Sequence, residues 1–315
     1  MNRLALTLLG LGLAFLGGCA TAPRDAPTKA EIGVIAVSPD IELRRLLVRN
    51  ASPKGIVLLL HGFPETVHAW TGIALALGRD YEVHAFDWPG YGLSSRPAAE
   101  RFPYAPRDYA RVLRAYIESA RIDRSNLVLY ATDIGALPSL LAALEDPALA
   151  RKLIVGDFAP FDRPQYMHET LQALKTRPAA DAVRAAMNRN RDEILQNAYR
   201  RGFTPEEQFD IPREFKDDMA RGWVHGEISS ADAFYRYYSH FSRDQAFFES
   251  NLARLRTPVK VVWGERDFYI KKEMGIEFAG RGGLEIVLLP GIGHYPHLQK
   301  PDTAIEEIRA AFTRW

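Results

Sequence analysis

The sequence predicts an α/β fold: a mostly parallel β-sheet flanked by helices, with a helical segment inserted late in the chain. Short apolar runs that are typical of buried strands, such as GIVLLLHG, alternate with amphipathic stretches that are typical of helices. The alternation stops between about residues 161 and 250, where no convincing strand occurs, and resumes with VKVVWG and LEIVLLP. Alternation of this kind favours parallel strands joined by right-handed crossovers.

The elements follow one another in a readable order. EIGVIAV and IELRRLLVRN predict an opening antiparallel pair, and the next strands are predicted at GIVLLLHG, YEVHAFD, residues 126–130 and KLIVGDF. Between them, PRDYARVLRAYIESARI carries an apolar stripe with helical spacing, formed by Tyr109, Val112, Leu113, Tyr116 and Ile117. We therefore predict a core made of residues 31–160 and 251–315, and a helical cap over residues 161–250.

Composition limits the possible functions. The chain has 315 residues, 47% of them hydrophobic, and a formal net charge of +1. That length supports a large core, and a charge so close to zero leaves no electrostatic footprint for nucleic acid. We expect neither a cofactor nor a metal ion, and the sequence leaves the oligomeric state open.

The N-terminus is typical of an exported protein. Arg3 precedes an apolar run, Leu4–Leu16, that is too short to span a bilayer, and Cys19 in LGGC is the only cysteine. This pattern resembles a bacterial lipoprotein signal, which implies cleavage after residue 18, a lipid on Cys19 and a membrane tether through a linker over residues 19–30. The alternative is a plain secretory signal with an incidental cysteine. Ala20, in place of aspartate, favours the outer membrane by resemblance to bacterial sorting patterns.

Polar or turn-forming residues follow the predicted strands at the edge where parallel sheets bind their ligands. ATDIG follows the apolar run LVLY, and a histidine follows the last strand in GIGHYPH. The residues at these strand ends are His61, Gly62, Phe63, Pro64, Asp87, Trp88, Asp133, Asp157, Asp267 and His294.

Over residues 31–315 the chain resembles an α/β-hydrolase whose nucleophile is an aspartate. The segment ATDIG has the small-x-nucleophile-x-small form of that family, with Asp133 where many members carry serine. The resemblance implies an eight-stranded sheet with an inserted lid. It makes His294 the base, with His297 as a competing choice, and Asp267 the orienting acid, with Asp157 as the alternative.

The resemblance also implies the surroundings of the nucleophile. The backbone N–H groups of Phe63 and Ile134 would stabilise an oxyanion, and the side chains of His61, Phe63 and Trp88 would contact the substrate. An aspartate attacks saturated carbon and forms an ester, which a water activated by His294 would then hydrolyse. Serine esterase chemistry is disfavoured, because no serine lies at the turn.

The substrate classes expected for such a nucleophile are epoxides and haloalkanes or haloacids. HGFPE and the aromatic segment AFYRYYSHF resemble epoxide hydrolases, whose tyrosines donate a proton to the opening ring. The candidate donors are Tyr166, Tyr235, Tyr237 and Tyr238. A dehalogenase is the first alternative, although neither Ile134 nor Phe63 offers a side-chain donor to a halide. The second alternative is an inactive binding protein with the same fold.

Overall fold

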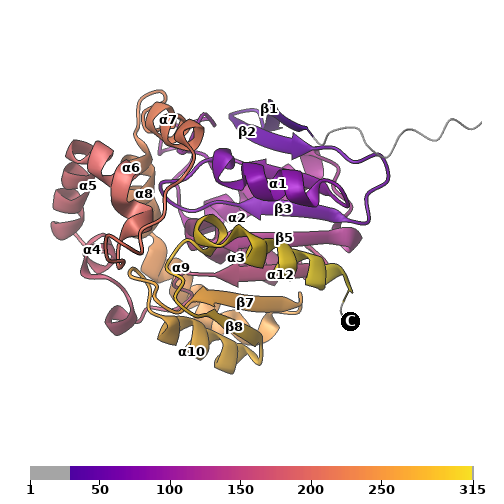
Figure 1. Ribbon diagram of the computed structural model, residues 1–315. Helices are drawn as coiled ribbons and strands as arrows, with labels where there is room; N and C mark the ends of the chain where they lie inside the picture. Colours follow the sequence, from indigo (N-terminus) through magenta and orange to yellow (C-terminus); the bar gives the residue numbers. More distant parts are fainter. Residues whose placement is uncertain (1–28, 314–315) are drawn as a thin grey trace, which may run out of the picture.

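The computed structural model describes residues 29–313, which form an eight-stranded sheet at the centre of the molecule (Figure 1). The strands lie in the order β1-β2-β4-β3-β5-β6-β7-β8. β1 and β2 pair antiparallel, β2 pairs antiparallel with β4, and all other neighbours are parallel. The predicted fold class is confirmed. The strands are β1 (Ala30–Ser38), β2 (Ile41–Val48), β3 (Ile56–Leu60), β4 (Glu82–Phe86), β5 (Leu127–Thr132), β6 (Lys152–Gly156), β7 (Val259–Gly264) and β8 (Glu285–Leu289).

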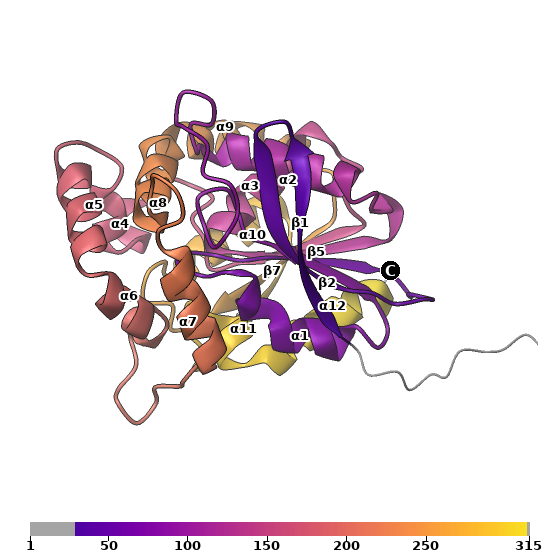
Figure 2. The same ribbon diagram turned by 90° about the horizontal axis from the view of Figure 1, so that it is seen from above.

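The apolar runs become strands because both faces of the sheet are covered. Every residue of β5 is buried, as expected for a continuous apolar strand in a parallel sheet. On one face lie α1 (Thr71–Leu77), α11 (Pro296–Gln299) and α12 (Pro301–Thr313); on the other lie α2 (Pro106–Ser119) and α3 (Ala136–Glu145) (Figure 2). The predicted stripe of α2, from Tyr109 to Ile117, is buried. α10 (Lys272–Gly282) connects β7 to β8.

A helical segment is inserted between β6 and β7. Its helices α4 to α8 gather beyond one end of the sheet (Figure 1), whereas α9 packs against α2 and α3 of the core. The helices are α4 (Glu169–Ala173), α5 (Ala179–Arg189), α6 (Arg191–Asn197), α7 (Arg213–Gly222), α8 (Ser230–Ser239) and α9 (Phe241–Asn251). Short 3-10 turns are η1 (Val67–Trp70), η2 (Arg124–Asn126), η3 (Asp133–Gly135), η4 (Pro164–Tyr166), η5 (Ala198–Arg200) and η6 (Leu252–Arg254).

A buried ionic cluster joins the cap to the sheet. Arg44 of β2 donates through Nε to Asp87, which follows β4, at 2.5 Å. Its two terminal nitrogens donate to both oxygens of Asp218 on α7, at 2.8 and 2.7 Å. All three side chains are buried. The guanidinium therefore satisfies two carboxylates that come from different layers of the molecule.

The predicted signal peptide and Cys19 lie outside the described residues, so export and lipidation remain predictions. Across residues 29–313, no helix combines the length and the apolar character needed to cross a membrane.

Candidate active site

Asp133 occupies a strained turn between β5 and α3. It is the first residue of η3 and has a φ of 49°, in the left-handed region that residues other than glycine seldom adopt. Such a turn lifts the side chain out of the strand direction and presents it beyond the carboxyl end of the sheet.

The loop after β3 lies directly against this carboxylate. A side chain at Gly62 would place its Cβ 2.6 Å from Asp133 Cβ and 2.7 Å from Asp133 Oδ1, so only glycine fits there. The closeness lets the Phe63 amide donate a hydrogen bond to Asp133 Oδ1 at 2.7 Å. Ile134, the other predicted donor position, is buried next to Asp133, and the role of its amide remains a prediction.

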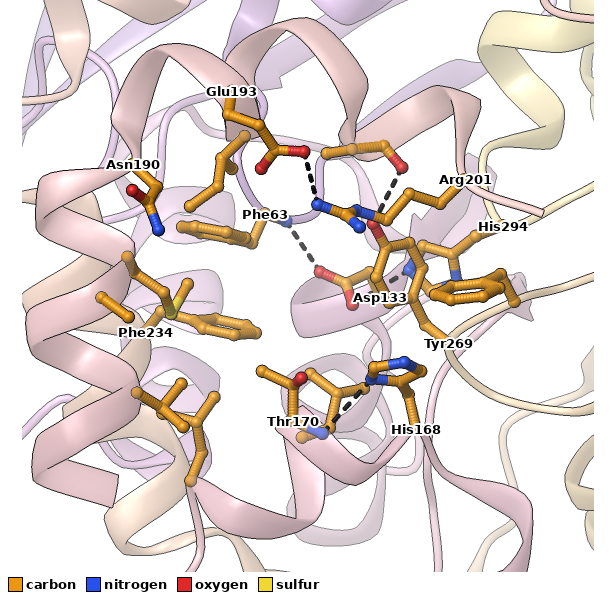
Figure 3. A pocket seen from close by; sticks show the side chains of 18 of the residues that line it. Phe63, Asp133, His168, Thr170, Asn190, Glu193, Arg201, Phe234, Tyr269 and His294 are labelled. Carbon is orange, nitrogen blue, oxygen red and sulfur yellow. Dashed lines mark hydrogen bonds and ion pairs between the residues drawn. The ribbon is translucent and has the colours of Figure 1, made fainter. Parts of the chain in front are cut away.

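His294 lies between two carboxylates. Its Nδ1 is 2.8 Å from Asp267 Oδ2, and its Nε2 is 3.3 Å from Asp133 Oδ2 (Figure 3 shows the contact with Asp133). Asp267 is itself fixed, because its Oδ1 accepts from the amides of Tyr269 and Ile270 at 2.8 and 3.0 Å. Burial alone lowers the pKa of His294, but the charges of Asp267 and Asp133 and their hydrogen bonds raise that pKa well above its usual value.

Asp157, the alternative acid, does not hydrogen-bond to His294. Its Oδ1 accepts from the Gly264 amide at 2.9 Å, and its buried Oδ2 has no hydrogen-bond partner in the described part of the chain. Burial, followed by the nearby charge of Asp267, raises the pKa of Asp157 well above its usual range. Donor atoms of Asp157, Asp267 and His294 lie within 4.8 Å of one another, as a metal site would require. However, both ring nitrogens of His294 already face carboxylates, so neither nitrogen is directed at a metal ion held between the three residues.

His297, the competing base, is held elsewhere. Its Nε2 lies 2.7 Å from Glu65 Oε1, and its ring stacks on Trp70 with 4.3 Å between centroids. Glu65 also accepts from the Gly62 amide at 2.8 Å. The glutamate of HGFPE therefore ties the loop beneath Asp133 to α11, and the structure brings His294, not His297, to the carboxylate.

A cavity of about 350 Å³ opens above Asp133 and His294. Phe63 forms one wall, where its ring stacks on Phe234 of α8 with 4.2 Å between centroids. Figure 3 shows Asp133 and His294 on one side of the cavity and the cap helices around the rest. The apolar cap residues that line it are Leu171, Leu174, Val183, Ala186, Met187, Ile194 and Ala198, and the polar ones are His168, Thr170, Asn190, Glu193 and Arg201.

Residues 57–308 match the family described as "Alpha/beta hydrolase family". The chain belongs to the alpha/beta hydrolase family. A segment of 106 residues, 33% of the chain, is 35% identical to a fluoroacetate dehalogenase of Burkholderia sp., and the match spans about a third of that protein (34%).

Solved structures of two proteins resemble this chain in fold. One is Cfl2 from Burkholderia cenocepacia, with a TM-score of 0.74, 20% identity and coverage of 92% of this chain and 98% of the other. The second is the epoxide hydrolase VrEH1 from Vigna radiata, with a TM-score of 0.73, 19% identity and coverage of 91% and 98%. At this identity the similarity shows the shared fold and nothing finer.

A smaller cavity lies beside Asp133, and its lining distinguishes among the four candidate proton-donor tyrosines. Tyr237 and Tyr238 both line it, but the Tyr237 hydroxyl donates to the Ile134 carbonyl at 3.2 Å. For the Tyr238 hydroxyl no hydrogen-bond partner is found within residues 29–313. The Tyr235 hydroxyl donates to Asp181 on α5 at 2.8 Å. Tyr235 and Tyr166 line neither cavity. Tyr238 is therefore the candidate that faces Asp133 with a hydroxyl free to donate.

His61 and Trp88 do not lie where a substrate was expected to contact them. Both are buried and line neither of the two described cavities. The indole of Trp88 donates to the His61 carbonyl at 3.1 Å, and the Trp88 amide donates to His61 Nε2 at 3.3 Å. The two residues join the loops after β3 and β4. Of the three residues expected at the substrate, only Phe63 lines a cavity.

Several residues of the site were not predicted from the sequence. Tyr269 packs edge-on against His294 with 5.0 Å between ring centroids, and the Tyr295 hydroxyl donates to the Phe63 carbonyl at 2.9 Å. The position of Tyr295, directly after His294, was a signal that could have indicated it. Glu193 of α6 and Arg201, directly after η5, come from the cap and belong to no recognisable motif.

Proposed function

We propose that this hydrolase opens an epoxide to a vicinal diol through an ester formed on Asp133. The observation that carries the proposal is the arrangement around one carboxylate: Phe63 N–H on one oxygen, His294 at the other, and the Tyr238 hydroxyl in the adjoining cavity. Asp133 thus lines both cavities, with a base on the wall of the large one and a candidate proton donor on the wall of the small one.

In the first step, Asp133 Oδ2 attacks an epoxide carbon and the C–O bond of the ring breaks. The ring oxygen takes the proton of Tyr238, and Oδ1, held by the Phe63 amide, remains the ester carbonyl oxygen. Burial and the charge of Asp133 raise the pKa of Tyr238 well above its usual value, which keeps the hydroxyl protonated before the attack. Esterification removes the Asp133 charge and so makes the loss of that proton easier.

In the second step, His294 takes a proton from water, and the resulting hydroxide adds to Cγ of Asp133. The oxyanion forms on Oδ1, where the Phe63 amide stabilises it. Collapse breaks the acyl–oxygen bond, the departing diol oxygen takes the proton from His294, and the proton left over restores the Tyr238 hydroxyl. His294 must be neutral to act. The loss of the Asp133 charge lowers the pKa of His294 at the stage that needs a base.

Dehalogenation is the second candidate, supported by the segment shared with the fluoroacetate dehalogenase. A departing halide needs N–H donors near the nucleophile. No tryptophan lines either described cavity, and the side chains of Phe63 and Ile134 offer no donor. These features favour an epoxide oxygen over a halide as the leaving group.

The test is intact-mass analysis of His294→Gln, which should form the ester and fail to hydrolyse it. After incubation with styrene oxide, we expect a mass gain equal to the whole epoxide molecule, and no comparable gain with 1-bromobutane, which would add only its butyl group. The double variant Asp133→Asn/His294→Gln is the matched control and should gain nothing. A folded His294→Gln protein that gains only butyl would transfer the proposal to dehalogenation, and one that gains neither would refute the Asp133 ester.

A further inference from the structure

The cap places one strong cation on the wall of the large cavity that Asp133 also lines. Arg201, directly after η5, and Glu193 of α6 both line the cavity (Figure 3). Arg201 Nη2 donates to Glu193 Oε1 at 2.7 Å. Within the described residues, Arg201 is the only lysine or arginine on the cavity wall.

Tyr269 sets the position of this pair relative to the reacting atoms. Its ring packs against His294, and its hydroxyl donates at 2.9 Å to the carbonyl of Ala198, in the turn that precedes Arg201. One tyrosine side chain therefore separates His294 from the guanidinium. Figure 3 shows the Arg201 side chain beside Tyr269, on the side of that ring away from His294.

Arg201 can exchange its ion pair with Glu193 for an ion pair with a ligand at little cost in free energy. The two side chains are 41% and 47% exposed, and ion pairs as accessible as this contribute little to stability. The structure records no bond from the guanidinium to any other described residue. A guanidinium binds an incoming carboxylate through two parallel hydrogen bonds, so most of its capacity is available to a ligand.

We propose that Arg201 binds the carboxylate of an amphipathic anionic substrate in place of Glu193. The apolar chain of that substrate would lie along Leu171, Val183, Met187 and Ile194, with the reacting carbon at Asp133. The negative charge of Asp133 repels a carboxylate placed beside it. The substrate therefore binds in one orientation, with its carboxylate at Arg201 and its reacting carbon at Asp133. The reacting group rests on the proposed function, whereas the carboxylate subsite does not.

Binding tests the subsite without chemistry. Isothermal titration calorimetry of the wild-type protein should show octanoate binding about tenfold or more tightly than octanamide, as expected for a charge-assisted pair. Arg201→Gln should remove that preference, and Glu193→Gln should increase it, because the competing carboxylate is gone. Arg213→Gln breaks an exposed ion pair on α7, away from the cavity, and is the control for loss of charge. Equal binding of octanoate and octanamide by the wild-type protein, a preference that Arg201→Gln leaves intact, or a preference that Glu193→Gln reduces would overturn the proposal.

Turnover separates this proposal from the proposed function. For 7,8-epoxyoctanoate and its primary amide, Arg201→Gln should reduce the carboxylate preference in kcat/KM by about tenfold, through KM. If octanoate binds through Arg201 but neither epoxide is turned over, the carboxylate subsite is supported and the proposed reaction is refuted. If the epoxides are turned over and Arg201→Gln does not change the preference for the carboxylate over the amide, the reaction is supported and the subsite is refuted.

Discussion

His294 Nδ1 lies 2.8 Å from Asp267 Oδ2, and this contact decides which of two candidate acids orients the imidazole. Asp157 reaches the same region from the neighbouring strand but directs its Oδ1 to the Gly264 amide. Since Nδ1 donates to Asp267, Nε2 is left facing Asp133. The two acids should therefore contribute unequally to the reaction.

We expect Asp267→Asn to slow hydrolysis of the ester by about 10²- to 10³-fold, because the imidazole loses the group that orients it and stabilises its protonated form. Formation of the ester should be affected much less. Asp157→Asn is the matched control and should keep most of the activity. Single-turnover kinetics would measure the two steps separately, and an equal loss in both variants would contradict this assignment.

Asp133→Asn should lower the pKa of His294. The folded protein raises that pKa because two carboxylates outweigh the effect of burial, and the substitution removes the charge of one of them. NMR titration of the imidazole measures the shift directly. Because a raised pKa stabilises the fold at low pH and that contribution is lost as the pH rises through the folded pKa, Asp133→Asn should also weaken the decline of stability above the ordinary pKa of 6.5. An unchanged titration would show that Asp133 does not act on His294.

Asp157→Asn should make the protein more stable at neutral pH. The folded pKa of Asp157 is raised above the ordinary value of 3.8, so between the two values the folded state holds a proton that the unfolded chain has released. The free energy of unfolding then falls as the pH rises through this interval. Asparagine does not titrate, and its Oδ1 can still accept from the Gly264 amide. Thermal unfolding between about pH 4 and pH 8 should show a growing advantage for the variant; parallel curves would contradict the prediction.

The sequence predicted the features of the fold that depend on local pattern. The apolar run of β5 and the stripe of α2 required only that neighbouring residues share one environment. Asp133 and His294 could be placed at one edge because parallel strands end on the same side. The sequence favoured Asp267 as the orienting acid but left Asp157 open as the alternative, since both follow adjacent strands. The choice depends on a backbone detail, the φ of 53° that turns Asp157 toward Gly264.

The sequence could not predict, for a related reason, which candidate tyrosine lies beside Asp133 with a free hydroxyl. Tyr235, Tyr237 and Tyr238 lie on one helical turn of α8, so their directions are fixed only when the cap docks on the core. In the structure, Tyr235 points to Asp181 in the cap and Tyr238 lines the cavity beside Asp133. A sequence pattern cannot specify how α8 is rotated about its axis when it packs on the core. Nor does the sequence pattern show that His61 and Trp88, which were expected at the substrate, are buried beneath the loops after β3 and β4.

We expect Tyr238→Phe to slow ester formation from an epoxide by about 10²-fold or more, because the opening ring loses its proton donor. Hydrolysis of an ester already formed should continue. Tyr235→Phe is the control on the same helix, since its hydroxyl donates to Asp181 and Tyr235 lines neither described cavity. Stopped-flow measurement of the first turnover distinguishes the steps. Equal effects of the two substitutions would show that Tyr238 is not the donor.

Arg44→Met should lower the free energy of unfolding by about 3–5 kcal/mol, because it removes the buried guanidinium that pairs with the buried carboxylates of Asp87 and Asp218, and the other arginine bound to Asp218, Arg221, is exposed. Urea unfolding measures the change, and Arg49→Met, which breaks an exposed pair with Glu31, should cost at most about 1 kcal/mol. Adding Asp87→Asn and Asp218→Asn to Arg44→Met should recover much of the loss, because the cost arises from unpaired charge and not from lost packing. No recovery in the triple variant would show instead that the shape of the guanidinium holds α7 of the cap on the sheet.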